Sequence, residues 1–340
     1  MSNSVIITSW NEIIPNRDSS NSNFDAISRS QHVSIVYDTN IVVMGGVHST
    51  SSPGVYSNDV WTSNNDGADW IQTVAVAPWV GRTRFTGVVY DNNIIIMGGY
   101  ASNGPKADVW SSSDGGLNWN EVVTTAPWGV RYSLSSVVYN SKIYIMGGGS
   151  YMNDVWSSPD GGLNWNQETA SAEWSARRFH SNVVYDDKIY VMGGYNPSTL
   201  NDVWSSSNGG INWDLVTSSA GWSARHSFSN AIYKNKMYIM GGRYVSSYYN
   251  DVWSSSDGGL NWIEITDDAE WSGRSDHTSL ATDNNIYIIG GESEMQTFND
   301  IWWVSTPSLK TSETVRTVVK GVWMSGHLIV IGMILINLLR

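Results

Sequence analysis

The stretch KIYIMGGGSYMNDVWSSPDGGLNW, residues 142–165, shows one complete copy of a unit that recurs along this chain of 340 residues. An apolar run ends in a Gly-Gly doublet, an Asp-aliphatic-Trp triplet follows a loop, and a second Trp comes nine residues after the first. A period of roughly 40 to 50 residues predicts repeated supersecondary units rather than one irregular domain. The doublets begin at Gly45, Gly98, Gly147, Gly193, Gly241 and Gly290, and the triplets at Asp59, Asp108, Asp154, Asp202, Asp251 and Asp300.

Each unit predicts four short strands, because β-branched or alternating runs are separated by turns of Asn, Asp, Ser and Gly. The sixth unit stops at Trp302-Trp303 without its second Trp strand, and the N-terminal stretch Val5–Glu12 resembles that missing strand. A last blade built from both termini leaves no free sheet edge. We therefore predict an all-β, six-bladed β-propeller of four-stranded blades over residues 4–305, closed by the N-terminal strand.

The combination of Gly-Gly doublet, spaced aromatics, strand Trp and a following Arg resembles the kelch-repeat family over about residues 4–305. That resemblance implies a binding fold. Several units also carry a Ser-x-Asp-x-Gly-x-x-Trp motif similar to the Asp-box hairpin, for example at Ser112–Trp119, Ser158–Trp165 and Ser255–Trp262. In the first unit the motif Asn64-Asp66-Gly67-Trp70 is out of register. We expect the Asp-box to be a folding device in which Asp closes a turn.

Composition excludes several classes of function. The formal net charge of −12 repels nucleic acid phosphates, so no nucleic acid partner is expected. The absence of cysteine excludes disulfides, thiolate metal sites and the Cys–Tyr crosslink that the galactose oxidase type needs. The six histidines form no metal-binding spacing and no phosphate loop is present, so neither metal nor cofactor is predicted.

No catalytic residue can be assigned. A sialidase would need unique arginine, tyrosine and carboxylate residues gathered at one site, whereas here the repeats supply Arg and Tyr throughout. The prediction is a non-catalytic and monomeric propeller that binds a protein. The alternative is a propeller that handles carbohydrate, as a lectin or as an enzyme acting on an acidic sugar such as sialic acid.

The candidate ligand-binding residues lie on one face, where the loops between blades and the loops between second and third strands meet. An Arg recurs in the inter-blade loops, mostly preceded by a Trp that we expect to be exposed. A ring of guanidinium groups suits an acidic segment; the alternative is that each Arg stacks on its Trp or pairs with an Asp. The arginines are Arg29, Arg82, Arg131, Arg177, Arg225 and Arg274, and the tryptophans are Trp79, Trp128, Trp174, Trp222 and Trp271.

The loops between second and third strands differ in length and chemistry, so they are where partners could be distinguished. Tyr and Arg are favoured interface residues. The predicted ligand-binding residues in these loops are Tyr100, Tyr195, Arg243, Tyr244 and Tyr248, with the loop of the fifth unit as the strongest candidate.

The C-terminal segment 321–339 is almost uninterruptedly apolar and, as a helix, would span about 28 Å, close to the thickness of a bilayer core. Residues 306–320 form a linker with three basic residues, Lys310, Arg316 and Lys320. We predict a transmembrane helix that anchors the propeller by its C-terminal tail on the cytosolic side. The alternatives are a helix that caps the propeller or binds a partner, and a soluble cytoplasmic protein.

Overall fold

The computed structural model describes residues 9–14, 28–48, 55–294 and 296–305. All regular elements in these ranges are β-strands. The predicted linker 306–320 and apolar segment 321–339 lie outside the described residues, as do residues 5–8 of the stretch Val5–Glu12. In the described part of the chain, no helix is long and apolar enough to cross a bilayer.

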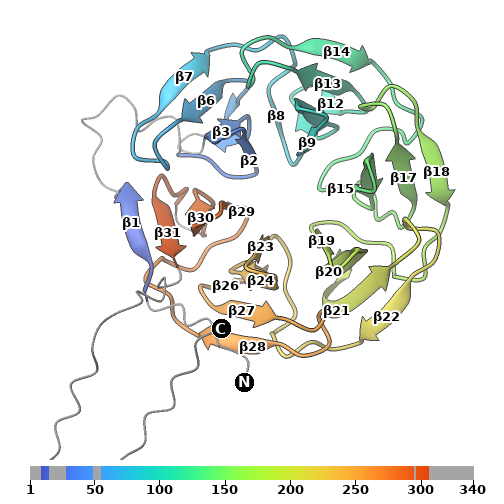
Figure 1. The fold of residues 1–340 in the computed structure, drawn as a ribbon, viewed down its shortest axis with the longest axis vertical. Coiled ribbons are helices and arrows are strands. Elements are labelled where there is room, and N and C mark those ends of the chain that lie inside the picture. The colour runs from blue at the N-terminus through green and yellow to red at the C-terminus, as the bar shows by residue number, and fades with distance from the viewer. Residues whose placement is uncertain (1–8, 15–27, 49–54, 295, 306–340) are drawn as a thin grey trace, which may run out of the picture. The chain divides into compact units, whose positions relative to one another are not determined.

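The described residues form six four-stranded antiparallel sheets, and Figure 1 shows them side by side around a common axis in chain order. Sheet 1 contains β2 (Val33–Tyr37), β3 (Asn40–Met44), β6 (Val60–Ser63) and β7 (Ile71–Val74); sheet 2 contains β9 (Thr86–Tyr90), β10 (Asn93–Met97), β13 (Val109–Ser112) and β14 (Asn120–Val123); sheet 3 contains β15 (Ser135–Tyr139), β16 (Lys142–Met146), β17 (Val155–Ser158) and β18 (Asn166–Thr169). Sheet 4 contains β19 (Ser181–Tyr185), β20 (Lys188–Asn196), β21 (Ser198–Ser206) and β22 (Asp214–Thr217); sheet 5 contains β23 (Ser229–Tyr233), β24 (Lys236–Met240), β27 (Val252–Ser255) and β28 (Ile263–Thr266); sheet 6 contains β29 (Thr278–Ala281), β30 (Asn285–Ile289), β31 (Ile301–Ser305) and β1 (Asn11–Ile14).

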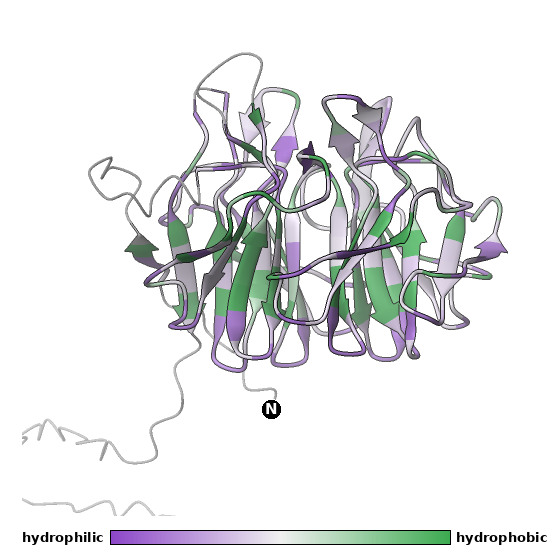
Figure 2. Ribbon diagram, turned by 90° about the horizontal axis from the view of Figure 1, so that it is seen from above, coloured by the Kyte–Doolittle hydropathy of each residue, from purple (hydrophilic) through white to green (hydrophobic). Residues whose placement is uncertain are grey.

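Short strands lie on one face of the ring, most of them where the chain passes from the second to the third strand of a sheet. These are β4 (Val47–His48), β5 (Val55–Tyr56), β11 (Tyr100–Ala101), β12 (Gly104–Pro105), β25 (Arg243–Tyr244) and β26 (Ser247–Tyr248). A further short strand, β8 (Arg82–Thr83), lies between sheets 1 and 2 and pairs with β11. Figure 2 shows hydrophobic residues in the middle of the sheets and hydrophilic residues at the short turns of the opposite face. The longer, more varied loops therefore share one face.

The N-terminal strand completes sheet 6, as the sequence predicts. β1 pairs antiparallel with β31, with Asn11 opposite Trp303 and Glu12 opposite Trp302. Trp10, which is only 4% exposed, packs edge-on against Trp271 with ring centroids 6.1 Å apart. It thus takes the place of the second Trp that the sixth unit lacks.

The inter-blade tryptophans are buried, so the expectation that they are exposed is wrong. None of the five is more than 3% exposed. Trp174, for example, packs edge-on against Trp213 of the next sheet, with centroids 5.9 Å apart. The sheets diverge away from the axis, and these indole pairs fill the resulting wedge. An aromatic pair adds about 0.5–1.5 kcal/mol beyond the burial of its area.

The Gly-Gly doublet is required where neighbouring backbones approach each other near the axis. At Gly46, whose φ is +91°, a Cβ atom would lie 2.7 Å from the carbonyl oxygen of Ser30. That approach, together with a left-handed backbone conformation, leaves room for glycine alone. The doublet is therefore a feature of the scaffold.

The Asp-box turns form as predicted. Ser112 Oγ donates to Asp114 Oδ1 at 2.8 Å and accepts from the Gly116 N–H at 2.9 Å, while Asp114 Oδ1 accepts from the Asn118 N–H at 2.9 Å. The indole of Trp119 donates to the Gly116 carbonyl at 2.8 Å. The motif closes the turn on itself and leaves its polar groups satisfied.

The first unit holds the same turn in the same register, which corrects the register assigned from its sequence. Its motif is Ser63, Asn65, Gly67 and Trp70, with Asn in the place of Asp. The Gly67 N–H donates to Ser63 Oγ at 2.9 Å, and Trp70 donates to the Gly67 carbonyl at 3.0 Å. An amide oxygen accepts the same backbone bond as a carboxylate, so Asn substitutes without a shift in register.

Candidate functional site

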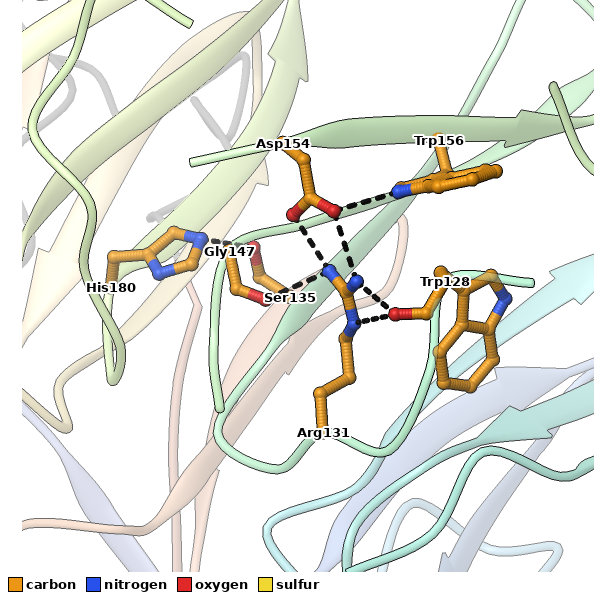
Figure 3. A network of polar contacts seen from close by, with 7 residues as sticks. All are labelled: Trp128, Arg131, Ser135, Gly147, Asp154, Trp156 and His180. Carbon is orange, nitrogen blue, oxygen red and sulfur yellow. Dashed lines mark hydrogen bonds and ion pairs between the residues drawn. The ribbon is translucent and has the colours of Figure 1, made fainter. Parts of the chain in front are cut away.

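The six repeat arginines are buried structural residues, each paired with the aspartate of its own Asp-aliphatic-Trp triplet. In sheet 3, shown in Figure 3, the two Nη atoms of Arg131 donate to the carboxylate of Asp154 at 2.9 and 3.0 Å. Arg131 also donates to the carbonyl oxygens of Trp128 and Gly147, and the indole of Trp156 donates to Asp154 at 2.8 Å. All three guanidinium nitrogens of Arg131 therefore donate hydrogen bonds within the scaffold.

The other five sheets repeat this geometry. The shortest ion-pair distances are 2.9 Å for Arg29–Asp59, 2.6 Å for Arg82–Asp108, 2.6 Å for Arg177–Asp202, 2.5 Å for Arg225–Asp251 and 2.5 Å for Arg274–Asp300. Burial alone would raise the pKa of Asp108, but the hydrogen bonds and charge of Arg82 outweigh burial and lower it. Asp108 is thereby held ionised as the partner of Arg82.

This arrangement corrects the ligand-binding prediction for Arg29, Arg82, Arg131, Arg177, Arg225 and Arg274. None of these side chains is more than 1% exposed, and each already holds a carboxylate of its own chain. The alternative expectation, that each arginine pairs with an aspartate, matches the structure. A ligand would have to displace a buried, bidentate ion pair to reach them, which is costly.

The residues that do face the axis on the loop-bearing face are those just after each repeat arginine. A hollow of about 140 Å³ lies there, lined in part by Arg84, Phe179 and Asp276. The second residue after each repeat arginine varies from sheet to sheet, and only Ser occurs twice. These residues are Gln31, Arg84, Ser133, Phe179, Ser227 and Asp276. The scaffold is repeated, but the chemistry at the axis is not.

A closed circle of backbone hydrogen bonds holds these six residues. Each N–H donates to the carbonyl oxygen of the corresponding residue in the preceding sheet at 2.8 to 3.1 Å, and the N–H of Gln31 closes the circle on Asp276. All six have φ between 54° and 57°, a left-handed conformation that costs energy in residues other than glycine. Their backbones are therefore fixed, and only their side chains vary.

Arg84 lines this hollow, and Arg178 and Arg243 lie close enough that their charges act together with that of Arg84 on His226. We name Arg84, Arg178, Phe179, Arg243, Asp276 and Glu292 the axial mouth. Arg178 is the first residue after a repeat arginine, while Arg243 and Glu292 directly follow Gly-Gly doublets. The Arg178 backbone bridges to Tyr195, and the backbones of Arg243 and Glu292 bridge in the same way to His226 and Ser275. Equivalent bridges in different sheets thus present different side chains.

The mouth arginines lie against aromatic rings. The guanidinium groups of Arg84 and Arg178 lie 5.1 and 5.2 Å from the ring centroid of Phe179. Arg178 also lies 4.8 Å from the ring of Tyr151 and donates to the hydroxyl of Tyr132 at 3.3 Å. These contacts hold the guanidinium groups in place but do not use their ability to bind a carboxylate with two hydrogen bonds.

No ion pair joins a mouth arginine to a carboxylate within the described residues. The Nε atoms of Arg84, Arg178 and Arg243 are buried without a hydrogen-bond partner among those residues. Arg243 makes one long bond, from Nη1 to the hydroxyl of Tyr248 at 3.4 Å. Half-buried guanidinium groups without a carboxylate are unusual, because a charge removed from water normally acquires a partner.

Two carboxylates form the other side of the mouth. Ser275 donates to Asp276 at 3.2 Å, and Ser30 donates to Glu292 at 2.6 Å. Burial raises the pKa of both carboxyl groups, and the charge of Asp276 raises that of Glu292 further, whereas the charges of Arg84 and Arg243 lower both. The acids are thus influenced by the mouth arginines without touching them.

His226 lies between these groups and is neutral at neutral pH. Burial, and then the positive charges of Arg243, Arg178 and Arg84, lower its pKa to about 4. Its ring packs on Phe179 and Tyr195, with both centroid distances at 5.6 Å. It adds a polar edge to the mouth without adding charge.

Three of the five residues predicted in the variable loops contact one another or the mouth. Arg243 donates to the hydroxyl of Tyr248, and the ring of Tyr195 lies 6.0 Å from the guanidinium group of Arg178. Tyr100 and Tyr244 are 38% and 47% exposed. Tyr100 packs edge-on between Tyr56 and Tyr132, with centroids 6.4 and 5.5 Å away. This aromatic row reaches the mouth through Tyr132, whose hydroxyl accepts from Arg178.

Sequence reasoning missed Arg84, Arg178, Phe179 and Asp276. Each was hidden because it follows a conspicuous repeat residue by one or two positions. The signal that could have found them is unequal residues at equal offsets: the offset after the repeat arginine holds Gln, Arg, Ser, Phe, Ser and Asp in turn.

The described residues hold no group of three or more His, Asp or Glu placed to bind a metal ion. A family model described as the KLHDC2/KLHL20/DRC7 Kelch-repeats domain matches residues 9–194 and 149–332, which together cover nearly the whole chain. This chain belongs to the kelch-repeat family. No curated protein matches it.

Kelch repeats are in general protein-interaction scaffolds and are typically not enzymes. In this kelch chain, the Gly-Gly doublets, the Arg–Asp pairs and the Trp pairs all belong to the scaffold. The residues that differ between its repeats gather at the axial mouth and on the loops around it.

Proposed function

We propose that this chain is a non-catalytic, six-bladed kelch scaffold that binds a protein through the face bearing the axial mouth. Arg84, Arg178 and Arg243 would hold acidic side chains of that partner, and the loop tyrosines around them would pack against its surface. The supporting observation is the contrast between paired repeat arginines and mouth arginines that lack a carboxylate.

Physical chemistry favours this use of the mouth. A guanidinium group offers a planar fork that matches a carboxylate bidentately, and packing on aromatic rings orders it before a ligand arrives. Ordering in advance reduces the entropy lost on binding. Arg and Tyr are also the residues that most often dominate interface energetics.

The test is capture of partners by the full-length chain, compared with a variant carrying Arg84→Gln, Arg178→Gln and Arg243→Gln. The matched control is Lys142→Gln, Lys188→Gln and Lys236→Gln, which removes the same charge at the turns of the opposite face. We expect the mouth variant to lose partners that the wild type and the control retain, as measured by quantitative mass spectrometry.

Retention of the same partners by the mouth variant would contradict the proposal. Binding of the wild-type chain to a glycan array, lost in the mouth variant while protein capture is unchanged, would instead favour the carbohydrate alternative. The wild type, the mouth variant and the Lys→Gln control are used in both experiments. The melting temperature of each protein shows whether it is folded.

We also propose that the apolar segment 321–339 anchors the chain in a membrane with the kelch domain on the cytosolic side. Its length and apolar composition support this, together with the three basic residues of the preceding linker. Fractionation of the full chain against a version ending at Thr306, followed by protease protection, tests it. Equal solubility of both versions would contradict membrane anchoring.

A further inference from the structure

The charges of the axial mouth are segregated by sheet. The three arginines come from sheet 2 (Arg84), the start of sheet 4 (Arg178) and the loop of sheet 5 (Arg243), whereas both carboxylates, Asp276 and Glu292, belong to sheet 6. Sheet 6 lies between sheets 5 and 1 in the ring (Figure 1). The mouth therefore has a positive side and a negative side around one hollow.

The two sides do not neutralise each other by direct contact. Among the described residues, no ion pair within 4.0 Å joins Asp276 or Glu292 to any arginine. The carboxylates instead accept hydrogen bonds from Ser275 and Ser30. The guanidinium groups of Arg84 and Arg178 lie over the ring of Phe179 and not on a carboxylate.

The backbone keeps the opposite charges apart, because it cannot easily move them closer together. The circle of hydrogen bonds holds Arg84, Phe179 and Asp276 at fixed positions around the axis. A hollow of about 140 Å³ remains between them. Opposite charges that are held apart across an open space can be satisfied together by a ligand that carries both signs.

Building on the proposed function, we infer that the axial mouth selects a peptide segment carrying an acidic and a basic side chain close together. The carboxylate of the segment is bound by Arg84, Arg178 and Arg243, and its ammonium or guanidinium group by Asp276 and Glu292. A segment with acidic residues alone leaves two carboxylates of the mouth opposing it. Discrimination by such repulsion is a common source of specificity.

The overall charge of the chain points the same way. A formal net charge of −12 repels a strongly acidic segment at long range and slows its approach. A segment with balanced charge meets no such barrier, and its two signs match the two sides of the mouth at short range. A peptide that carries both signs is therefore compatible with the net charge of the chain at long range and with the charges of the mouth at short range.

Selection from a display library of short random peptides tests this inference on the full-length chain. The variants are Asp276→Asn with Glu292→Gln, which removes the negative side, and the triple Arg→Gln mouth variant, which removes the positive side. The Asp→Asn and Glu→Gln substitutions preserve size, and the melting temperature of each variant checks its fold.

We expect the wild type to enrich peptides in which Asp or Glu lies close to Lys or Arg. The Asp276→Asn, Glu292→Gln variant should keep the acidic preference and lose the basic one. A selected peptide should lose affinity by about tenfold or more when its basic residue is changed to Gln, as for loss of a charged hydrogen bond. The same change should have no effect on binding to that variant.

Two outcomes overturn the inference, and they differ in what they imply. Enrichment of acidic residues without basic ones, unchanged by Asp276→Asn and Glu292→Gln, refutes mixed-charge recognition and leaves the proposed function standing. A wild-type selection without acidic enrichment refutes both the inference and the role of the mouth arginines.

Discussion

Two arginines adjacent in the sequence have opposite surroundings. Arg177 is 0% exposed, and its fork is closed by the carboxylate of Asp202 at 2.6 and 2.7 Å. Arg178 is half-buried among Phe179, Tyr151 and Tyr195 and has no carboxylate partner within the described residues. The difference separates two roles: the repeated arginine belongs to the scaffold, and the unrepeated one is the residue that we propose binds a ligand.

The largest effect should come from breaking a scaffold pair. Arg225→Met leaves the carboxylate of Asp251, itself only 8% exposed, without its partner. We expect a loss of about 3–5 kcal/mol in the free energy of unfolding, measured by denaturant titration. Adding Asp251→Leu should restore much of it, since replacing both members of a buried pair is often close to neutral. A loss below about 1 kcal/mol in the single variant would contradict the assigned role.

Acid should weaken the scaffold through its buried histidines. Burial, followed by the charge of Arg177, lowers the pKa of His180 to about 3. The unfolded chain takes up a proton near pH 6.5, so the stability from neutral His180 is complete above that pH and is lost as pH falls toward 3. At pH 5 the loss is about 2 kcal/mol.

The matched replacement for this test is His180→Phe, because Phe85 and Phe228 occupy the same position in sheets 2 and 5. We expect the difference in unfolding free energy between pH 7 and pH 5 to shrink in this variant. An unchanged pH dependence would show that His180 does not carry the effect.

Removing the carboxylate of Asp276 from the mouth should stabilise the folded chain at neutral pH. Burial raises the pKa of Asp276, so ionisation of this group at neutral pH works against folding. Asp276→Asn should therefore raise the melting temperature at neutral pH, and the gain should fade as pH falls through the ordinary carboxyl range. A decrease in melting temperature at neutral pH would mean that the charges of Arg84 and Arg243 need this carboxylate.

The smallest effect on stability is expected at Arg178. Arg178→Gln removes cation–aromatic contacts but no ion pair, so the free energy of unfolding should change by less than about 1 kcal/mol. Capture of acidic partners should nevertheless weaken. A large destabilisation would assign Arg178 to the scaffold together with Arg177.

The scaffold could be predicted from sequence because each of its parts is repeated. The Gly-Gly doublets, the triplets and the second Trp gave the strand order, and the incomplete sixth unit indicated that β1 pairs with β31. Repetition also misled: an Arg in every unit suggested a ring of exposed cations, whereas a residue needed in every sheet is one that the scaffold itself uses.

The axial mouth could not be predicted in the same way. Arg84 and Glu292 are far apart in the sequence, and only the ring of sheets brings them close enough for the charge of Arg84 to act on Glu292. That Arg82 is buried and Arg84 faces the axis depends on a backbone turn with positive φ at Arg84. No hydrophobic pattern reports such a turn in advance.

The most direct test of these two roles is the reactivity of arginines with phenylglyoxal in the native full-length chain, mapped residue by residue by mass spectrometry. We predict that Arg84, Arg178 and Arg243 react in the folded protein, while Arg177 and the other five repeat arginines react only after unfolding. Equal reaction of Arg177 and Arg178 in the folded chain would contradict the division between scaffold and mouth.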